Sequence, residues 1–153
     1  MSANSKTSPH ALQSAPLVRL IDYWQTLTPE SVESIAGVYA QDACFRDPFN
    51  DVRGIDKIRH IFSDMFVRLD APRFTIIDTI EQPHGVLLIW DFDFRISTLK
   101  PALQRRIHGA SHIRFDAAGR VNYHRDYWDA AGELYEQLPL VGSLMRLLRK
   151  RFA

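Results

Sequence analysis

The sequence lacks the residues that several common classes of protein require. Its 153 residues include a single cysteine, Cys44, so it can form no internal disulfide and cannot build a cysteine-rich zinc site. Its longest strongly apolar run, Val86–Trp90, is far shorter than the roughly 20 residues that span a bilayer. The first residues lack the positive start and apolar stretch of a secretory signal. We therefore expect a cytoplasmic protein without a membrane-spanning helix.

An excess of one charge and the common catalytic motifs are missing as well. The 19 basic and 18 acidic residues leave a net charge of +1, which argues against a nucleic-acid partner bound over the whole domain. No glycine-rich phosphate loop, G-x-S-x-G or H-E-x-x-H motif occurs. His108 and His112 would stand about 13 Å apart on a strand, too far to share a metal ion. We expect neither a metal nor another cofactor.

The first half of the chain has helical periodicity after a polar start. Residues 1–15 are rich in Ser, Ala and Pro without periodicity, which predicts a disordered tail. Thr28-Pro29-Glu30 is typical of a helix N-cap followed by proline. Apolar residues recur at helical spacing in three segments, 17–27, 32–39 and 55–69.

The hydrophobic period then falls to two, which predicts strands. They begin at Phe74 and continue over residues 90–96, 107–115 and 121–128, with a hairpin turn at 116–119. Helices followed by antiparallel strands indicate an α+β domain over residues 16–130. A curled sheet under three helices would enclose either an apolar pocket for a small molecule or a solid core. The periodicity leaves both open.

Residues 131–153 return to helical spacing and form a predicted C-terminal helical extension. Its leucines are too many for one narrow stripe, and a basic cluster follows at 146–151. It could cover the pocket mouth, extend a dimer interface or lie on an anionic membrane surface. Pro139 and Gly142 interrupt the helix, so we expect it to pack on the protein rather than on a membrane.

Asp47 is the most informative carboxylate in the first half of the chain. It lies between Phe45 and Phe49, and Pro48 keeps it out of helical geometry. A carboxylate in such apolar company is a candidate general base. The alternative is an outward aspartate that accepts hydrogen bonds from the amides of a turn.

Two segments carry a resemblance to a known superfamily. Ile35–Phe49, followed by Gly54 and a helix, resembles the second helix and first strand of ketosteroid isomerases and SnoaL-like polyketide cyclases, which are nuclear transport factor 2-like proteins. Ile113–Val121, followed by Tyr127-Trp128, is similar to their last hairpin. The resemblance covers about residues 16–128. It implies a curved antiparallel sheet packed against three N-terminal helices, a cone-shaped pocket, and a homodimer formed by the outer face of the sheet.

The resemblance also implies roles for single residues. Asp47 falls on the general base of the isomerases, and Tyr23 on the tyrosine that donates a hydrogen bond to the developing oxyanion. Tyr39 matches a supporting tyrosine. Where the isomerases hold a protonated aspartic acid as second donor, an ungapped alignment places Ser111, a shorter and weaker donor.

The same alignment turns two titratable side chains, His124 and Asp126, towards the pocket, together with Trp128. Their expected neighbours across the hairpin are Ser111, Gly109 and Ile107. Isomerases carry apolar side chains in place of the titratable pair, which instead resembles the acid–base pairs of cyclases, dehydratases and epoxide hydrolases of this superfamily. The alternative is that Asp126 forms an ion pair at the strand edge, with Arg125 or Arg106.

Together these features predict an enzyme that performs cofactor-free acid–base chemistry of the isomerase, cyclase or hydratase type. Its ligand would be a small apolar, oxygenated molecule such as a steroid-like or polyketide-like ring. The expected catalytic residues are Asp47, Tyr23, Asp126 and His124. The expected substrate-binding residues are Tyr39, Phe62, Trp90, Phe92, Ser111 and Trp128. The alternative is a non-catalytic binding or assembly module of the same fold, with the pocket filled by Trp24, Trp90 and Trp128 and with Asp47 exposed.

Overall fold

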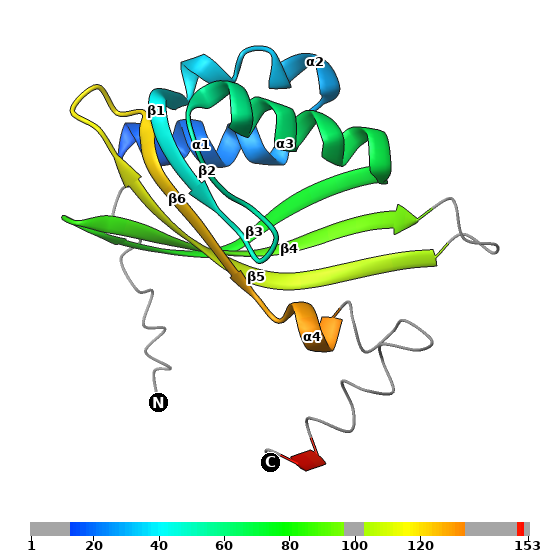
Figure 1. The fold of residues 1–153 in the computed structure, drawn as a ribbon. Helices are drawn as coiled ribbons and strands as arrows, with labels where there is room; N and C mark the ends of the chain where they lie inside the picture. The colour runs from blue at the N-terminus through cyan, green and yellow to red at the C-terminus, as the bar shows by residue number, and fades with distance from the viewer. Residues whose placement is uncertain (1–12, 97–102, 134–149, 152–153) are drawn as a thin grey trace, which may run out of the picture.

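The computed structural model describes residues 13–96, 103–133 and 150–151 (Figure 1). The helices are α1 (Ala15–Gln25), α2 (Pro29–Val32), the 3-10 turn η1 (Ile35–Gly37), α3 (Ile55–Arg68) and α4 (Ala130–Glu133). The strands are β1 (Tyr39–Arg46), β2 (Asp51–Arg53), β3 (Asp70–Gln82), β4 (Gly85–Ile96), β5 (Leu103–Phe115) and β6 (Val121–Trp128). Residues 1–12 of the predicted tail and 134–149 of the predicted extension lie outside the described residues. No described helix is long and apolar enough to cross a membrane.

The strands form one curved, unclosed sheet in the order β2-β1-β6-β5-β4-β3. Helices α1, α2 and α3 lie over its inner face, whereas α4 lies on the opposite side (Figure 1). The α+β architecture predicted from the sequence is therefore confirmed. One detail differs, because β1 pairs with β6 in parallel while all other pairs are antiparallel.

The predicted helix over residues 32–39 is wrong in its second half. Its N-cap is as expected, since Thr28 and Ser31 form a reciprocal capping box. The helix stops at Val32, a single 3-10 turn follows, and β1 starts at Tyr39. The apolar spacing is helical here, but the burial of Tyr39 comes from a strand that pairs with β6.

The predicted neighbours across the β5–β6 hairpin are displaced by two residues. Asp126 pairs with Ser111, and Trp128 pairs with Gly109. The cause is the turn, in which the backbone N–H of Asp116 bonds the carbonyl of Arg120, followed by a bulge next to Phe115. An even displacement leaves every side chain on its predicted face of the sheet.

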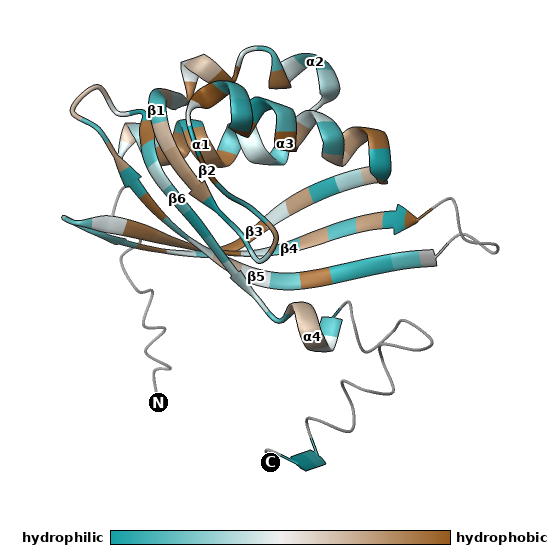
Figure 2. Ribbon diagram, in the orientation of Figure 1, coloured by the Kyte–Doolittle hydropathy of each residue, from teal (hydrophilic) through white to brown (hydrophobic). Residues whose placement is uncertain are grey.

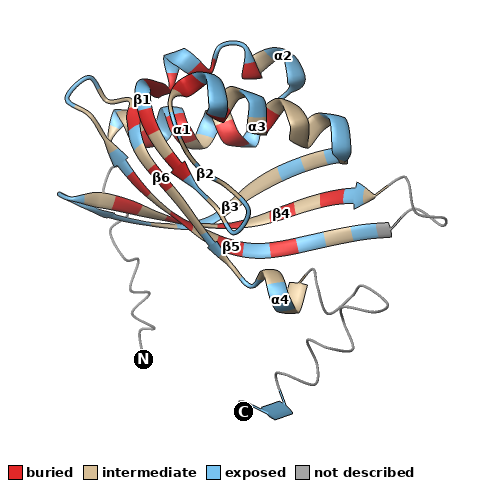
Figure 3. Ribbon diagram, in the orientation of Figure 1, coloured by how far each residue is buried: buried red, intermediate tan, exposed pale blue. Residues whose placement is uncertain are grey.

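The core lies between the helices and the inner face of the sheet. The apolar segments of β1, β4 and β5 and of the overlying helices coincide with the buried segments (Figures 2 and 3). Along β4 the burial alternates as predicted, with Trp90, Phe92 and Phe94 buried and the intervening aspartates turned to the other face. The alternation makes β4 the aromatic floor of the inner face.

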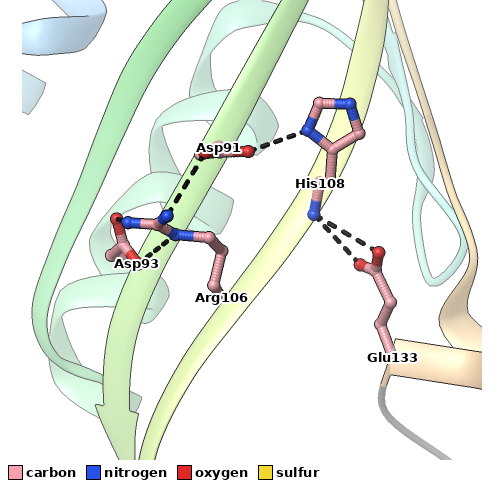
Figure 4. A network of polar contacts seen from close by, with 5 residues as sticks. All are labelled: Asp91, Asp93, Arg106, His108 and Glu133. Atoms are coloured by element: carbon pink, nitrogen blue, oxygen red, sulfur yellow. Dashed lines mark hydrogen bonds and ion pairs between the residues drawn. The ribbon is translucent and has the colours of Figure 1, made fainter.

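The outer face of β4 and β5 carries a polar network that attaches α4 (Figure 4). Arg106 makes two hydrogen bonds of 2.8 and 2.9 Å to Asp93, which lower the pKa of that carboxyl group. His108 Nδ1 lies 2.8 Å from Asp91, and the backbone N–H of His108 donates to the Glu133 carboxylate at 3.2 Å. Burial raises the pKa of Glu133. The Glu133 carboxylate thus accepts the backbone N–H of His108, which lies next to Gly109 in the last β5–β6 pair.

Gly109 leaves the space in which the Trp90 indole lies. A Cβ added at Gly109 would stand 2.6 Å from Trp90 Cζ2, far inside van der Waals contact, whereas a Cβ at Gly37 would meet nothing within 4 Å. We expect Gly109→Ala to lower the free energy of unfolding by ~1–3 kcal/mol through overpacking. Urea denaturation of this variant beside Gly37→Ala measures the difference. Equal stability of the two variants would show that the indole is not held against β5.

Candidate functional site

A cavity of about 640 Å³ lies between α3 and the inner face of the sheet. This volume is within the range of small-molecule sites. The predicted ligand contacts Phe62, Trp90, Phe92 and Trp128 line it. Further apolar lining residues are Phe45, Phe49, Ile61, Met65, Leu69, Phe74, Phe94, Ile96 and Ile107. This apolar hollow lies beside the packed core of the inner face.

The aromatic walls are packed against one another. Phe74 stacks on Phe92 with ring centroids 4.4 Å apart, and its edge faces Trp90 at 5.6 Å. On the opposite wall Phe45 and Phe62 meet edge to face at 6.0 Å. Such contacts fix the ring orientations, so the cavity has a defined shape before any ligand binds.

The polar residues at the cavity are a group on α3, the turn residues Asp47 and Asn50, and Asp126 on β6. On α3, Arg68 and His60 contact Asp64 at 3.3 and 3.8 Å, so that carboxylate is already paired. Deeper in the cavity stands Asp126, whose side chain is 17% exposed. A carboxylate surrounded by aromatic rings is the group most suited to proton transfer here.

A chain of hydrogen bonds runs from Trp24 through Tyr39 and His124 to Asp126. Trp24 Nε1 donates to the Tyr39 hydroxyl at 3.3 Å, and that hydroxyl lies 2.8 Å from His124 Nδ1. Because a carboxylate can only accept, His124 donates its Nε2–H to Asp126 Oδ1 at 2.7 Å. In the neutral imidazole Nδ1 then accepts, so the Tyr39 proton goes to Nδ1.

A second chain reaches the same oxygen from the other side. Trp90 Nε1 donates to Ser111 Oγ at 2.8 Å, so the serine proton is free to go to Asp126 Oδ1, 2.5 Å away. Both chains thus end on Oδ1. Within the described part of the chain, no hydrogen bond reaches Asp126 Oδ2. Two hydrogen bonds to Oδ1 thus fix the orientation of the Asp126 carboxylate, while Oδ2 makes no hydrogen bond to the described residues.

The histidine of the first chain is enclosed by aromatic rings. His124 is 1% exposed, its ring stacks on Trp24 at 4.8 Å, and the edge of Phe45 contacts it at 4.7 Å. Burial raises the pKa of Tyr39 well above its usual value, so this hydroxyl remains a donor across the physiological range. His124, Tyr39 and Ser111 are therefore buried and do not line the cavity, whereas Asp126, to which His124 and Ser111 are bonded, does.

Asp47 lines the cavity, but its carboxylate accepts hydrogen bonds from the backbone of the turn that follows it. Its Oδ1 accepts the backbone N–H groups of Phe49 and Asn50 at 2.7 and 2.6 Å, and both oxygens lie 3.0 Å from Asn50 Nδ2. This is the turn-bonding alternative considered for Asp47 from the sequence. The turn also holds Phe49 edge-on to Trp128 at 5.6 Å.

Tyr23 is not among the residues that line the cavity. Its hydroxyl donates to the carbonyl of Ser31 at 3.2 Å, and burial raises its pKa to about 12. Asp126 does not pair with an arginine among the described residues, because Arg106 binds Asp93 and Arg125 lies over the Tyr127 ring at 4.8 Å. The structure thus brings together Asp126, His124 and Asp47, and leaves Tyr23 outside.

The sequence analysis missed the two indole donors that orient the site. Trp24 and Trp90 were recognised as apolar residues, and Trp90 as a ligand contact, but neither as a hydrogen-bond donor. A usable signal existed, since a buried indole N–H needs an acceptor. Phe74, which stacks on the cavity floor, was assigned only to a strand.

Known structures share this architecture at low sequence identity. TsrD from Streptomyces laurentii is 15% identical with a TM-score of 0.68, covering 84% of this chain and 98% of its own. A protein from Shewanella putrefaciens CN-32, described as a SnoaL-like polyketide cyclase, is 17% identical with a TM-score of 0.66, covering 82% and 99%. A hypothetical protein of ketosteroid isomerase-like fold from Catenulispora acidiphila DSM 44928, in complex with trimethylamine, is 13% identical with a TM-score of 0.66, covering 80% and 91%.

At these sequence identities the similar structures show a shared fold and do not show a shared reaction. No curated protein matches the sequence significantly. The SnoaL-like domain model matches residues 20–124, which include the second half of α1, the sheet up to His124 and most of the cavity wall. The chain belongs to the SnoaL-like domain family.

Proposed function

We propose that the protein is a small-molecule enzyme in which Asp126 is the general base. The observation that carries the proposal is the convergence of His124 and Ser111 on one oxygen of a carboxylate that faces an aromatic cavity. The substrate would be an apolar, oxygenated molecule of steroid-like or polyketide-like chemistry. The reaction would be of the isomerase, cyclase or hydratase type and would take place in the cytoplasm without a cofactor or a nucleic-acid partner.

In this mechanism the free oxygen of Asp126 removes a proton next to a substrate carbonyl. The electron pair of the broken C–H bond moves to the carbonyl oxygen, and the carboxylic acid returns the proton at another atom. Ser111 and His124 keep the carboxylate in one orientation through both steps. Because the carboxylate is already oriented, it need not reorganise during the reaction, whereas the same reaction in water requires the solvent to reorganise.

The developing negative charge on the substrate oxygen needs a donor other than Tyr23, whose hydroxyl is bonded to Ser31. Uncharged and cationic N–H groups in the cavity wall can replace it: those of Asn50, His60, Arg68 and Trp128. Asp47 would then be a positioning residue, since it holds the turn from which Asn50 reaches the wall.

The alternative function is a non-catalytic binding module. Aromatic walls around a carboxylate also suit a small ammonium ligand, and the Catenulispora protein of this fold was solved with trimethylamine. The two functions predict different effects of replacing Asp126 on ligand binding. A catalytic base can be removed with ligand binding retained, whereas the partner of an ammonium cannot.

Asp126→Asn keeps the size of the side chain and the acceptor for Ser111 and His124 but removes the base. We expect loss of ~10²–10⁴ in rate with ligand binding largely retained. The assay is exchange of the α-protons of 2-tetralone for deuterium, followed by NMR, with binding measured by thermal shift.

Asp47→Asn is the matched control. It places an amide against the Asn50 side chain, so we expect a lower melting temperature and a loss of exchange much smaller than that of Asp126→Asn, because the turn is weakened but the base remains. Full exchange activity in Asp126→Asn, or its loss in Asp47→Asn alone, would contradict the assignment of the base. Exchange at the buffer rate in the wild type, with ligand binding lost in Asp126→Asn, would favour the binding module.

We further propose that two copies pair through the outer face of the sheet. An apolar strip crosses this face where Ile80 lies opposite Leu87, and Ile89 opposite Ala110. Ile80 is 48% exposed. An apolar strip across a sheet face is stabilised by removal from water, and a second copy would supply a matching surface.

Size-exclusion chromatography with light scattering measures the assembly. We expect twice the chain mass at micromolar concentration, and the single-chain mass for Ile89→Lys, which places a charge in the strip. Val18→Lys on the exposed side of α1 is the control, since Val18 is 51% exposed on the other side of the molecule. A wild-type monomer would refute the dimer.

A further inference from the structure

A second hollow of about 570 Å³ opens where β1 and β6 stop pairing. The last paired residues are Arg46 and Arg125, after which β1 enters the turn at Asp47 and β6 continues to Trp128 beside β5 alone. We call this hollow the seam groove. It is lined by Arg46, Asp47, Pro48, Arg125, Asp126, Tyr127 and Trp128.

The seam groove and the aromatic cavity meet at the proposed base. Asp47, Asp126 and Trp128 line both hollows. A ligand that extends from one hollow to the other would therefore pass Asp126. The two hollows differ in chemistry, because the cavity is aromatic whereas the seam groove adds two guanidinium groups.

The two arginines of the seam groove are poorly neutralised by the protein. They are direct neighbours on adjacent strands, where like charges repel. Among the carboxylates of the described residues, Arg46 pairs with Asp51 alone, at 3.6 Å with that side chain 73% exposed, and such surface pairs contribute little. Arg125 lies over the Tyr127 ring and pairs with no carboxylate among the described residues. The stacked ring holds the guanidinium in place without neutralising it.

The carboxylates at the junction have partners of their own. Asp47 accepts two backbone N–H groups and the side-chain amide of Asn50. Asp126 accepts Ser111 and His124 on Oδ1, on the inner side of the sheet. The outer rim of the seam groove therefore presents guanidinium donors whose strongest complement is an anion with several oxygens.

We propose that the seam groove binds the anionic end of the ligand, a carboxylate, sulfonate or phosphate, while the apolar body lies in the aromatic cavity. This inference rests on the proposed function and narrows its substrate class to amphipathic organic acids. It also gives the substrate a direction. The charged end anchors at Arg46 and Arg125, and the bond next to that end lies beside Asp126.

A matched pair of fluorescent probes tests the anion preference. 1-Anilinonaphthalene-8-sulfonate and N-phenyl-1-naphthylamine share an aromatic body, and only the first carries a sulfonate. We expect the wild type to bind the sulfonate probe more tightly. We expect Arg125→Gln to raise the Kd of that probe about tenfold, as for loss of one charge-assisted hydrogen bond, and to leave the neutral probe unchanged.

Arg114→Gln is the control, because Arg114 lies over the Tyr123 ring at 5.0 Å as Arg125 lies over Tyr127, yet does not line the seam groove. Arg125→Lys should keep most of the preference if the charge is what matters. An unchanged sulfonate Kd in Arg125→Gln, or an equal rise in Arg114→Gln, would overturn the proposal while leaving the role of Asp126 intact. Failure of the neutral probe to bind would overturn it too, because the cavity would not accept the apolar body.

Discussion

The arrangement of the site depends on the fact that the Asp126 carboxylate can accept hydrogen bonds but cannot donate one. Trp24 on α1 and Trp90 on β4 stand at the two outer ends of one connected chain of polar groups. Because Asp126 Oδ1 accepts from Ser111 and from His124, the neutral imidazole accepts at Nδ1 from Tyr39, and the two indoles donate to the two hydroxyl groups. The direction of the whole network follows from the carboxylate on which both chains end.

This constraint explains why polar side chains are tolerated in the core. Ser111, Tyr39 and His124 are almost wholly excluded from solvent. An unpaired polar group at such depth costs ~1–3 kcal/mol, whereas a fully paired chain makes the same groups into a rigid support. The supporting residues come from α1 and from four strands of the sheet, β1, β4, β5 and β6, so the position of the base depends on the packing of α1 against the sheet.

The sequence carried most of the fold and part of the site, and the difference has a physical cause. Strict alternation along β4 and the turn after Phe115 are local patterns, so the strands and their faces could be predicted. The strand start at Tyr39 could not, because its burial depends on pairing with β6, some eighty residues later in the chain. The register across the last hairpin likewise depends on a bulge beside Phe115, which apolar periodicity does not record.

The same distinction applies to the candidate site residues. Trp90 was placed on the covered face from side-chain alternation, and Asp126 and Trp128 were placed at the pocket from the alignment with the resembled family; all three line the cavity. Asp47 bonds Asn50, three residues later in the chain, and Tyr23 bonds Ser31, eight residues later, whereas the resemblance assigned them the roles of general base and oxyanion donor. Resemblance transferred the position of these side chains and not their partners. The partners decide the chemistry.

The protonation of His124 tests the central claim most directly. Nitrogen-15 NMR of the imidazole distinguishes a neutral ring protonated on Nε2 from one protonated on Nδ1 and from an imidazolium. The account predicts the neutral form with the proton on Nε2, because Tyr39 donates to Nδ1 and Asp126 accepts from Nε2. A proton on Nδ1 at neutral pH, in either the neutral or the charged ring, would contradict the direction of the chain and with it the assignment of Asp126 as the oriented base.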